Sequence, residues 1–166
     1  MKIPVLETNR LRLRAPTIDD WPDYLRFMQS DRAVHMDGPF SEQTAWGMFC
    51  HDVAQWALMG HGALMIEDRT TGQCQGQVAI NHGPLFPEHE LGWMLYSGSE
   101  GRGIAFEAAQ ALRTWGFATL GLKTLVSYID AENTPSRALA ARLGAVLDDT
   151  ATGPHPDDLV YRHPSP

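Results

Sequence analysis

The sequence has little basic charge. Of its 166 residues, 13 are Lys or Arg and 20 are Asp or Glu, which gives a formal net charge of −7. A protein that binds nucleic acid needs a basic stripe to displace counterions from the phosphate backbone, and this composition offers none. We therefore expect no nucleic-acid partner.

Cysteine is equally scarce. Cys50 and Cys74 are far apart in the chain and show no paired spacing. Neither a zinc knuckle nor a disulfide framework is therefore indicated, and we expect two buried thiols and no metal.

Long apolar runs are also missing. The chain reaches a charge at Glu7 before a secretory apolar core has formed, and no later run is long enough to span a bilayer. We expect a soluble, cytoplasmic protein without a membrane partner. At this length, residues 1–166 are expected to form a single domain that buries its own core.

One turn broken by glycines, from Glu100 to Ala108, stands out. Gly101 and Gly103 lack a Cβ, so the backbone can adopt positive φ there and direct successive N–H groups at one point. The following apolar residues have helical spacing: Ile104, Ala108, Leu112 and Trp115. The turn therefore lies at a helix N-terminus, where free N–H groups and the helix dipole favour an anion. We interpret it as a phosphate cradle, although a tight connection without a ligand has the same local pattern.

Strands flank this turn and its helix. Residues 89–96 precede the turn and residues 125–129 follow the helix, and both stretches are strand-like. A right-handed crossover of this kind places the turn at the carboxyl end of its strand, where open α/β sheets bind ligands.

The rest of the chain alternates between helix and strand patterns. The arginines of the first strand are expected to form a solvated edge. Helices are expected over residues 21 to about 30, 41–60 and 135–143, with a loop over 31–40. Strands are expected over residues 10–14, 63–66, 76–80, 146–147 and 159–161.

Three separated stretches carry a resemblance to a known family. They are the alternating stretch Leu6 to Arg14, then Ile18-Asp19-Asp20, and finally Leu143-Gly144-Ala145. Together they resemble the GCN5-related N-acetyltransferase (GNAT) superfamily and, within it, the RimJ/RimL-like branch of ribosomal-protein alanine acetyltransferases. The resemblance implies an α/β (α+β) GNAT fold, with a mixed, mostly antiparallel central sheet of six to seven strands, a splayed pair of parallel strands and about four helices.

The resemblance also implies that acetyl-CoA is the acetyl donor. The family's coenzyme A signature is Gln or Arg, two residues, Gly, one residue, then Gly or Ala, and here Glu100, Gly103 and Ala105 occupy those places. The first position departs from the signature and brings a carboxylate near the pyrophosphate. The donor-binding residues that the resemblance implies are Met94, Leu95, Tyr96, Gly101, Arg102, Gly103, Ile104, Ala105 and Asn133.

Two of these positions have implied roles beyond general contact. The backbone N–H of Met94 or Leu95 is implied as the oxyanion donor for the thioester carbonyl. Asn133 is implied to hold a pantetheine amide, and it also suits a helix N-cap.

Direct attack of an amine on a thioester needs a base, because only the neutral amine is nucleophilic. Glu90 is the first candidate for this base, and His89 and His82 are weaker ones. A surface carboxylate at the start of a strand is the alternative interpretation of Glu90.

The leaving thiolate needs an acid. The family's usual acid is a Tyr, and this chain has Ala140 at that place. The resemblance implies that Ser136 substitutes for it, with Tyr96 or Tyr128 as other sources of a proton. A plain helix-start role for Ser136 is equally compatible with the sequence.

The sequence predicts an N-acetyltransferase that acts on a primary amine in a ternary complex. The acceptor, a protein N-terminus or a small-molecule amine, has no readable motif, although residues 31–40 and 150–158 are expected to determine it. A non-catalytic acyl-CoA-binding or sensor domain is the alternative, suggested by Glu100 and Ala140. A dinucleotide-binding module fits less well, because a full glycine fingerprint is missing. A homodimer is compatible with the resemblance alone.

Overall fold

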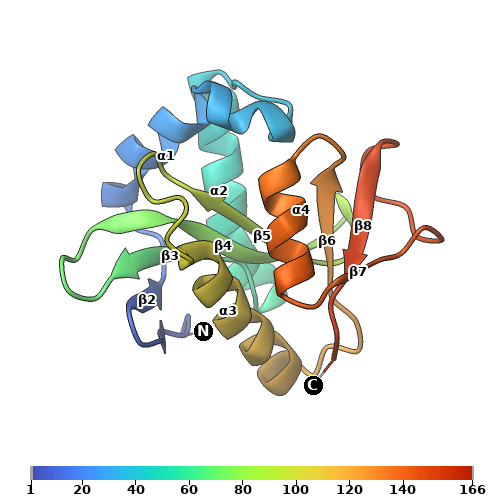
Figure 1. The fold of residues 1–166 in the computed structure, drawn as a ribbon. Helices are drawn as coiled ribbons and strands as arrows, with labels where there is room; N and C mark the ends of the chain where they lie inside the picture. Colours follow the sequence, from blue (N-terminus) through green and yellow to red (C-terminus); the bar gives the residue numbers. More distant parts are fainter. Residues whose placement is uncertain (1, 166) are drawn as a thin grey trace.

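A computed structural model describes residues 2–165 as one mixed sheet with helices on both faces (Figure 1). In chain order the elements are β1 (Leu6–Glu7), β2 (Leu11–Arg14), the 3-10 helix η1 (Ile18–Asp20), α1 (Trp21–Met28), the 3-10 helix η2 (Asp31–Met36), α2 (Glu42–Met59), β3 (Ala63–Asp68), β4 (Cys74–Gly83), β5 (Phe86–Leu95), α3 (Ile104–Leu120), β6 (Val126–Asp130), α4 (Thr134–Arg142), β7 (Val146–Leu147) and β8 (Asp158–Arg162).

The eight strands lie in the order β1-β2-β3-β4-β5-β6-β8-β7. Neighbouring strands are antiparallel except β5 and β6, which run parallel. That pair shares one register position, Glu90 with Val126, so the strands separate towards their carboxyl ends. The expected mixed sheet with a splayed parallel pair is confirmed, with the short β1 as an additional strand.

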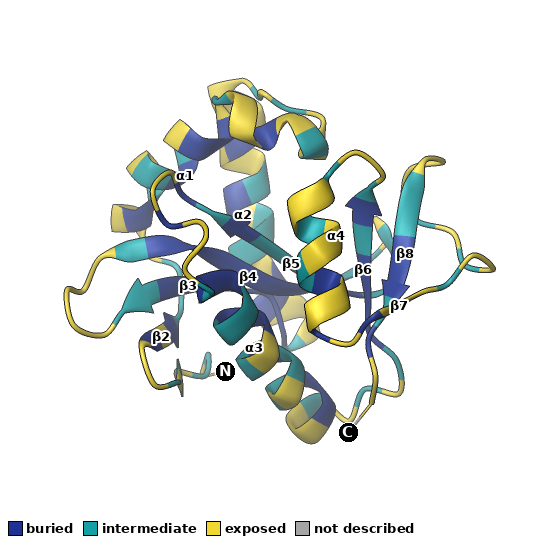
Figure 2. Ribbon diagram, in the orientation of Figure 1, coloured by how far each residue is buried: buried dark blue, intermediate teal, exposed yellow. Residues whose placement is uncertain are grey.

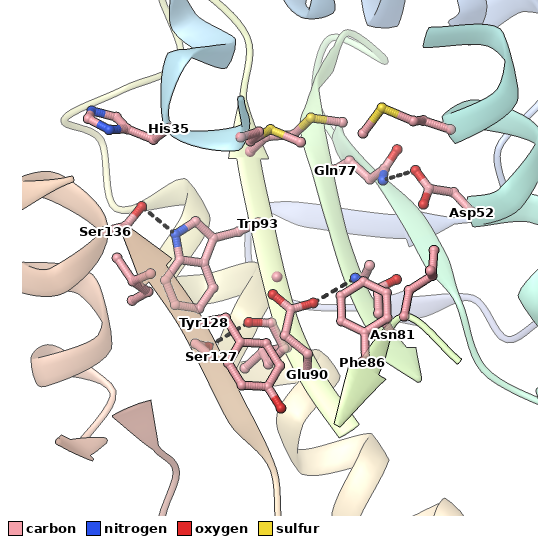
Figure 3. A pocket seen from close by; sticks show the side chains of 18 of the residues that line it. His35, Asp52, Gln77, Asn81, Phe86, Glu90, Trp93, Ser127, Tyr128 and Ser136 are labelled. Carbon is pink, nitrogen blue, oxygen red and sulfur yellow. Dashed lines mark hydrogen bonds between the residues drawn. The ribbon is translucent and has the colours of Figure 1, made fainter. Parts of the chain in front are cut away.

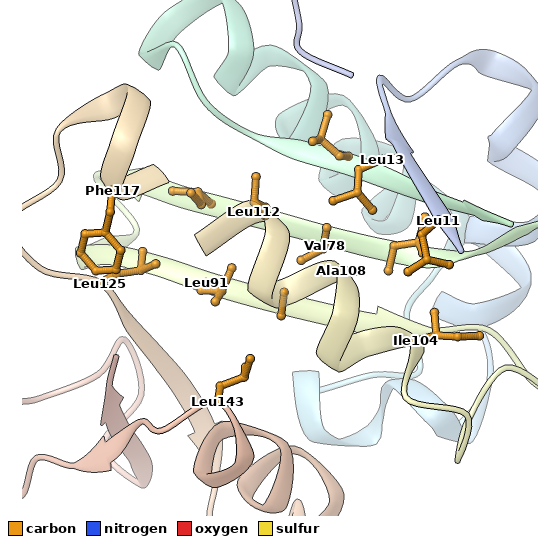
Figure 4. Packing of buried hydrophobic residues seen from close by; sticks show 14 of the residues in the cluster. Leu11, Leu13, Val78, Leu91, Ile104, Ala108, Leu112, Phe117, Leu125 and Leu143 are labelled. Carbon is orange, nitrogen blue, oxygen red and sulfur yellow. The ribbon is translucent and has the colours of Figure 1, made fainter. Parts of the chain in front are cut away.

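Side chains on β5 alternate between two apolar cores. Leu91 lies in the cluster under α3, together with Leu112 (Figure 4). Met94 lies in a second cluster with Tyr24, under α1 and α2. The sheet is buried between these layers, while the outer faces of the helices are exposed (Figure 2). Because side chains alternate along a strand, Glu90 shares the α2 face with Met94.

Local capping sets the ends of the helices around the site. The Ser41 side chain accepts a hydrogen bond from the N–H of Thr44 at 3.1 Å, and Gly60 ends α2 with a φ of 80°. Gly103, with a φ of 74°, directly precedes α3. The predicted second helix and the predicted position of the glycine turn are both confirmed.

Two segments differ from the expectation. Residues 31–36 form the 3-10 helix η2 instead of a loop, after an N-cap at Ser30. Strand β5 begins at Phe86 and not at residue 89, because Phe86 pairs with Gly83 and closes a tight hairpin with β4.

The arginines of β2 are not simply solvated. Arg14 contacts Asp20 at 2.8 Å and Glu67 at 2.6 Å, and the Asp20 side chain is only 4% exposed. The expectation of a solvated edge is therefore wrong for Arg14.

Cysteines and possible metal ligands are dispersed. Cys50 is exposed and Cys74 is partly buried, so the expectation of two buried thiols is wrong for Cys50. Within residues 2–165, no group of three or more His, Cys, Asp or Glu side chains is arranged to hold a metal ion. Over the same residues, no helix has both the length and the apolar character needed to cross a membrane.

Candidate active site

The glycine turn joins the end of β5 to the start of α3. Gly101 and Gly103 have φ values of 71° and 74°, in the left-handed region that favours glycine. Within residues 2–165, the N–H groups of Gly101, Arg102 and Gly103 have no hydrogen-bond acceptor. Because these donors lie at the positive end of α3, the turn has the properties of an anion site.

Glu100, the residue that departs from the coenzyme A signature, is paired with a residue outside the turn. Its carboxylate forms an ion pair with Arg32 of η2 and accepts a hydrogen bond from the N–H of Gly98 at 2.9 Å. Arg32 also donates to the carbonyl oxygen of Leu95 at 2.8 Å. The negative charge at this position is therefore balanced by a cation from a distant element.

Arg10, which lies between β1 and β2, contacts the turn, and sequence reasoning missed this contact. Its Nε donates to Glu107 Oε2 at 2.7 Å and its Nη1 donates to the carbonyl oxygen of Arg102 at 2.9 Å. Its Nη2 lies 3.5 Å from where a Cβ on Gly103 would be. The Arg10 guanidinium is thus held at the N-terminus of α3, paired with Glu107, and its side chain is 47% exposed, as expected for a solvated edge. The pairing joins residues 97 positions apart, so the sequence carried no signal for it.

A cavity of about 580 Å³ opens beside the splayed strands (Figure 3). It is enclosed by η2, α2, β4, β5, β6 and the start of α4. Four of the predicted site residues line it, Glu90, Met94, Asn133 and Ser136, and so does Tyr128, one of the alternative acids. The glycine turn and Tyr96 are outside the lining, so the predicted residues form two neighbouring parts, a cradle and a cavity.

Glu90 contributes a buried carboxyl group to this cavity, and the residue is only 9% exposed. Its Oε2 accepts a hydrogen bond from Asn81 Nδ2 at 2.7 Å. A Cβ on Gly92 would lie 3.0 Å from Glu90 Oε1, so the glycine leaves space for the carboxyl group. Burial raises the pKa of Glu90 to about 7, although the Asn81 hydrogen bond acts to lower it. The alternative of a surface carboxylate does not fit this environment.

Asp52 of α2 is a second carboxyl group in the cavity, and sequence reasoning missed it. Its Oδ2 accepts hydrogen bonds from Gln77 Nε2 at 2.7 Å and from the Tyr24 hydroxyl at 3.3 Å. Burial raises the pKa of Asp52 to about 6. Its partners lie 25 and 28 positions away in the chain, and an acidic residue on a helix is ordinarily part of the solvated face.

Ser136 lies at the first turn of α4 beside the splay. Trp93 Nε1 donates to Ser136 Oγ at 3.2 Å. Because an indole N–H can only donate, Ser136 is the acceptor and keeps its own proton available. Asn133 Oδ1 accepts from the N–H of Ser136 at 3.2 Å, so Asn133 caps α4. Ala140, at the family's usual Tyr position, is fully buried.

The two tyrosines considered as acids have different positions. Tyr128 lines the cavity, and its hydroxyl accepts from the N–H of Glu88 at 3.0 Å. The Tyr96 hydroxyl is buried without a partner among residues 2–165, and its ring packs near Phe27 with ring centroids 6.1 Å apart. Tyr128 is therefore the better placed phenol.

The two histidines considered as bases form a stack outside the cavity lining. His82 and His89 have ring centroids 4.1 Å apart and an interplanar angle of 8°. Burial lowers the pKa of His89 to about 4, so its imidazole is neutral at physiological pH. Glu90 remains the candidate base in the cavity.

Along β5, the backbone groups of alternate residues face the side of β6, where the two parallel strands separate. The carbonyl oxygen of Met94 points at Gly76 of β4. The carbonyl oxygen of Leu91 faces the other way and accepts from Ser127 Oγ of β6 at 2.6 Å. Because backbone groups alternate along a strand, Leu95 faces the splay and Met94 does not.

Comparisons with known proteins agree with this architecture. The family described as "Acetyltransferase (GNAT) domain" matches residues 10–146. An acetyltransferase of known structure from Agrobacterium tumefaciens strain C58 is 54% identical, with a TM-score of 0.96 over 99% of this chain and 96% of that one. The uncharacterized N-acetyltransferase YnaD of Bacillus subtilis strain 168 is 26% identical over 143 residues, which are 84% of this chain and 81% of YnaD.

A further structure bears on the branch. It comes from Vibrio cholerae and is described as a proposed ribosomal-protein-serine acetyltransferase. It is 27% identical, with a TM-score of 0.76 over 96% of this chain and 97% of that one. This likeness supports the resemblance to the RimJ/RimL-like branch. The chain belongs to the GNAT acetyltransferase family and is an N-acetyltransferase.

Proposed function

We propose that the protein transfers the acetyl group of acetyl-CoA to a primary amine, by direct attack in a ternary complex. The observation that carries this proposal is the buried carboxyl group of Glu90, which lies with the Ser136 hydroxyl in a cavity beside the splayed strands. A base and an acid next to an anion-binding turn are the groups that this reaction requires.

The residues of the turn fit the donor's pyrophosphate. Backbone N–H groups from Gly101 to Ala105 are directed by two positive φ values and end at the start of α3, and Arg10 and Arg102 add positive charge. The pairing of Glu100 with Arg32 reduces the repulsion that a free carboxylate would cause. RimL, a structure of the same fold at 17% identity, was solved in complex with coenzyme A, which supports a donor site of this kind.

Glu90 is proposed as the general base. The bound donor supplies an activated thioester, and the acceptor must lose a proton to attack it. A carboxyl group with a pKa of about 7 is substantially ionised at neutral pH and is basic enough to accept that proton, directly or through a water molecule. Asn81 holds one carboxylate oxygen and leaves the other free to face the amine.

Two further groups complete the proposal. The N–H of Leu95, on the side of β5 that faces the splay, would stabilise the negative charge that develops on the carbonyl oxygen. Ser136 would donate a proton to the leaving thiolate, since its hydroxyl already accepts from Trp93. Asn133, which lines the same cavity, would hold a pantetheine amide.

The test is a thiol-release assay with acetyl-CoA and a panel of amines, with the purified protein and a blank without amine. We expect coenzyme A thiol to appear only when an accepted amine is present, and the acetylated amine to be identified by mass. Saturable binding of acetyl-CoA without any amine-dependent release would contradict the proposal and favour the non-catalytic alternative.

A further inference from the structure

The ionisable groups that line the cavity are acidic side chains, histidines and tyrosines. Asp52, Glu90 and Asp130 line it, and across the described chain no Lys or Arg is among the lining residues. Asp130 is bound by His35 at 2.7 Å. Asp52 and Glu90 form no ion pair within residues 2–165. His51 also lines the cavity, and it acts electrostatically to lower the pKa of Asp52. A cation that occupies the cavity would therefore meet two carboxyl groups that no Lys or Arg of the described chain pairs.

Each of these carboxyl groups has one oxygen without a partner. Asp52 uses Oδ2 for both of its hydrogen bonds, and Glu90 uses Oε2 for its one. In the part of the chain that the structure describes, no donor reaches Asp52 Oδ1 or Glu90 Oε1. Gln77 Oε1 is also buried without a donor. The cavity thus offers hydrogen-bond acceptors at both carboxyl groups and calls for a ligand that donates.

The two carboxyl groups are held at different points along β4. Gln77, the partner of Asp52, and Asn81, the partner of Glu90, lie four positions apart on the same face of that strand. Between them are Ala79 and its cross-strand neighbour Gly92. These small residues form the floor of the cavity and leave its space free of side chains. The Glu90 carboxyl group lies against Gly92. Along β4, Gln77 is four positions from Asn81 and two positions from Ala79, which lies opposite Gly92. At about 3.3 Å per residue, these spacings place the two carboxyl groups roughly 7 to 13 Å apart.

Apolar side chains make up a large part of the remaining lining. They include Met36, Met48, Leu85, Phe86 and Trp93, of which Phe86 and Trp93 are labelled in Figure 3. An acceptor that matches both the floor and this apolar lining has hydrogen-bond-donating cations at its ends and methylene groups between them.

We propose that Asp52, held by Gln77, forms a second amine-binding subsite, and that the acceptor is an aliphatic diamine. This inference rests on the proposed function and specifies its acceptor. One amino group of the diamine loses a proton to Glu90 and attacks the thioester. The new C–N bond forms as the C–S bond breaks, and the thiolate leaves as the thiol. The other amino group stays an ammonium ion bound to Asp52.

The experiment compares three acceptors in the thiol-release assay at saturating acetyl-CoA: 1,4-diaminobutane, 1-aminobutane and a short peptide amide with an N-terminal serine. A charged hydrogen bond contributes about 1.5–3 kcal/mol, which corresponds to about 10- to 100-fold in affinity. We therefore expect the diamine to exceed the monoamine in kcat/KM by about 10- to 100-fold, and to exceed the peptide as well.

The variant Asp52→Asn separates a binding role from a structural one. It should abolish most of the preference for the diamine, mainly through a higher KM for that acceptor, and Asp52→Glu should restore part of it. Asp19→Asn removes an exposed carboxylate that does not line the cavity, and it should keep the native preference. Calorimetric titration of the coenzyme A-saturated protein with the diamine gives a second readout, in which binding should weaken in Asp52→Asn.

The outcomes distinguish the inference from the function on which it rests. Equal use of diamine and monoamine, or an equal loss for both in Asp52→Asn, would overturn the subsite and leave acetyl transfer intact. A clear preference for the peptide would overturn the diamine in favour of a protein N-terminus. No release with any amine would overturn the proposed function and the subsite together.

Discussion

The glycine turn, proposed as the pyrophosphate cradle, is built from one continuous stretch, whereas the cavity proposed for the acceptor is assembled from elements far apart in the chain. The proposed donor cradle would use backbone N–H groups between Gly101 and Ala105, at the start of α3. The acceptor cavity depends on side chains such as Asp52 of α2 and Glu90 of β5, which are each fixed by a residue of β4.

The difference determines how each side tolerates change. A backbone site depends on conformation, so it is sensitive to the loss of a glycine and insensitive to most side-chain identities. A side-chain site depends on which group stands at each position and on its protonation. Substitutions should therefore act on donor affinity in the cradle, and on turnover, pH dependence and acceptor choice in the cavity.

The largest effect is expected from Glu90→Gln, which removes the proposed base. General-base catalysis contributes about 10²- to 10⁴-fold, so kcat should fall by that order while the affinity for acetyl-CoA changes little. In the native protein the ionised form is active, so kcat/KM should rise with pH through about 7, the raised pKa of Glu90. Measured pH–rate profiles should lose this rise in the variant. An unaltered profile would remove Glu90 from the mechanism.

The same variant should change stability in a pH-dependent way. Burial raises the pKa of Glu90 from 4.5 to about 7, so the folded protein binds this proton more tightly than the unfolded chain does. The native protein therefore loses stability as the pH rises from the unfolded value through about 7, and Glu90→Gln does not. At pH 8 the variant should be more stable by on the order of 3 kcal/mol, and near pH 4 the two should be alike.

Denaturant unfolding of both proteins at the two pH values measures this difference. A variant that is less stable than the native protein at pH 8 would show that the carboxylate is stabilised where it lies, contrary to the account.

A smaller effect is expected from Ser136→Ala. If the hydroxyl protonates the leaving thiolate, kcat should fall by about 10-fold or more with little change in either KM. The thermal midpoint should be recorded alongside, because Trp93 Nε1 loses its acceptor in this variant. Native turnover in a folded variant would return Ser136 to a purely structural role at the start of α4.

The smallest effects concern the charge at the edge of the cradle. Arg32→Ala frees the Glu100 carboxylate near the donor anion and should weaken acetyl-CoA binding by about 3- to 10-fold. Glu100→Gln alone should change the Kd by less than about 3-fold, since its charge is already balanced. Adding Glu100→Gln to Arg32→Ala should recover most of the loss. Calorimetric Kd values that show no recovery would assign Arg32 a role independent of Glu100.

The position and conformation of the glycine turn were predictable from sequence because their signals are local. The positive φ values of Gly101 and Gly103 follow from the absence of a Cβ, and the helix after them follows from apolar spacing. The ends of α2, at Ser41 and Gly60, were predictable for the same reason. The splayed pair came from the resemblance and not from any pattern in the strands.

The make-up of the cavity was predictable only in part. Glu90 was identified, but its burial and raised pKa depend on the packing of β5 against β4 and α2. Asp52 and Arg10 were missed because their partners lie 25 to 97 positions away, and nothing local separates such a residue from an ordinary surface charge. The helix η2 was missed because its 3-10 geometry extends over only residues 31–36.

The most direct test of the account is a calorimetric titration of the native protein with acetyl-CoA, beside two matched variants. Gly103 and Gly72 have φ values of 74° and 73°, and a Cβ would be uncrowded at either position, so Gly103→Asp and Gly72→Asp impose similar backbone strain. The account predicts saturable binding by the native protein and by Gly72→Asp, and a loss of at least about 100-fold in Gly103→Asp, where a carboxylate opposes the anion. Equal affinities for the two variants, or no binding by the native protein, would contradict the assignment of the glycine turn as the donor site.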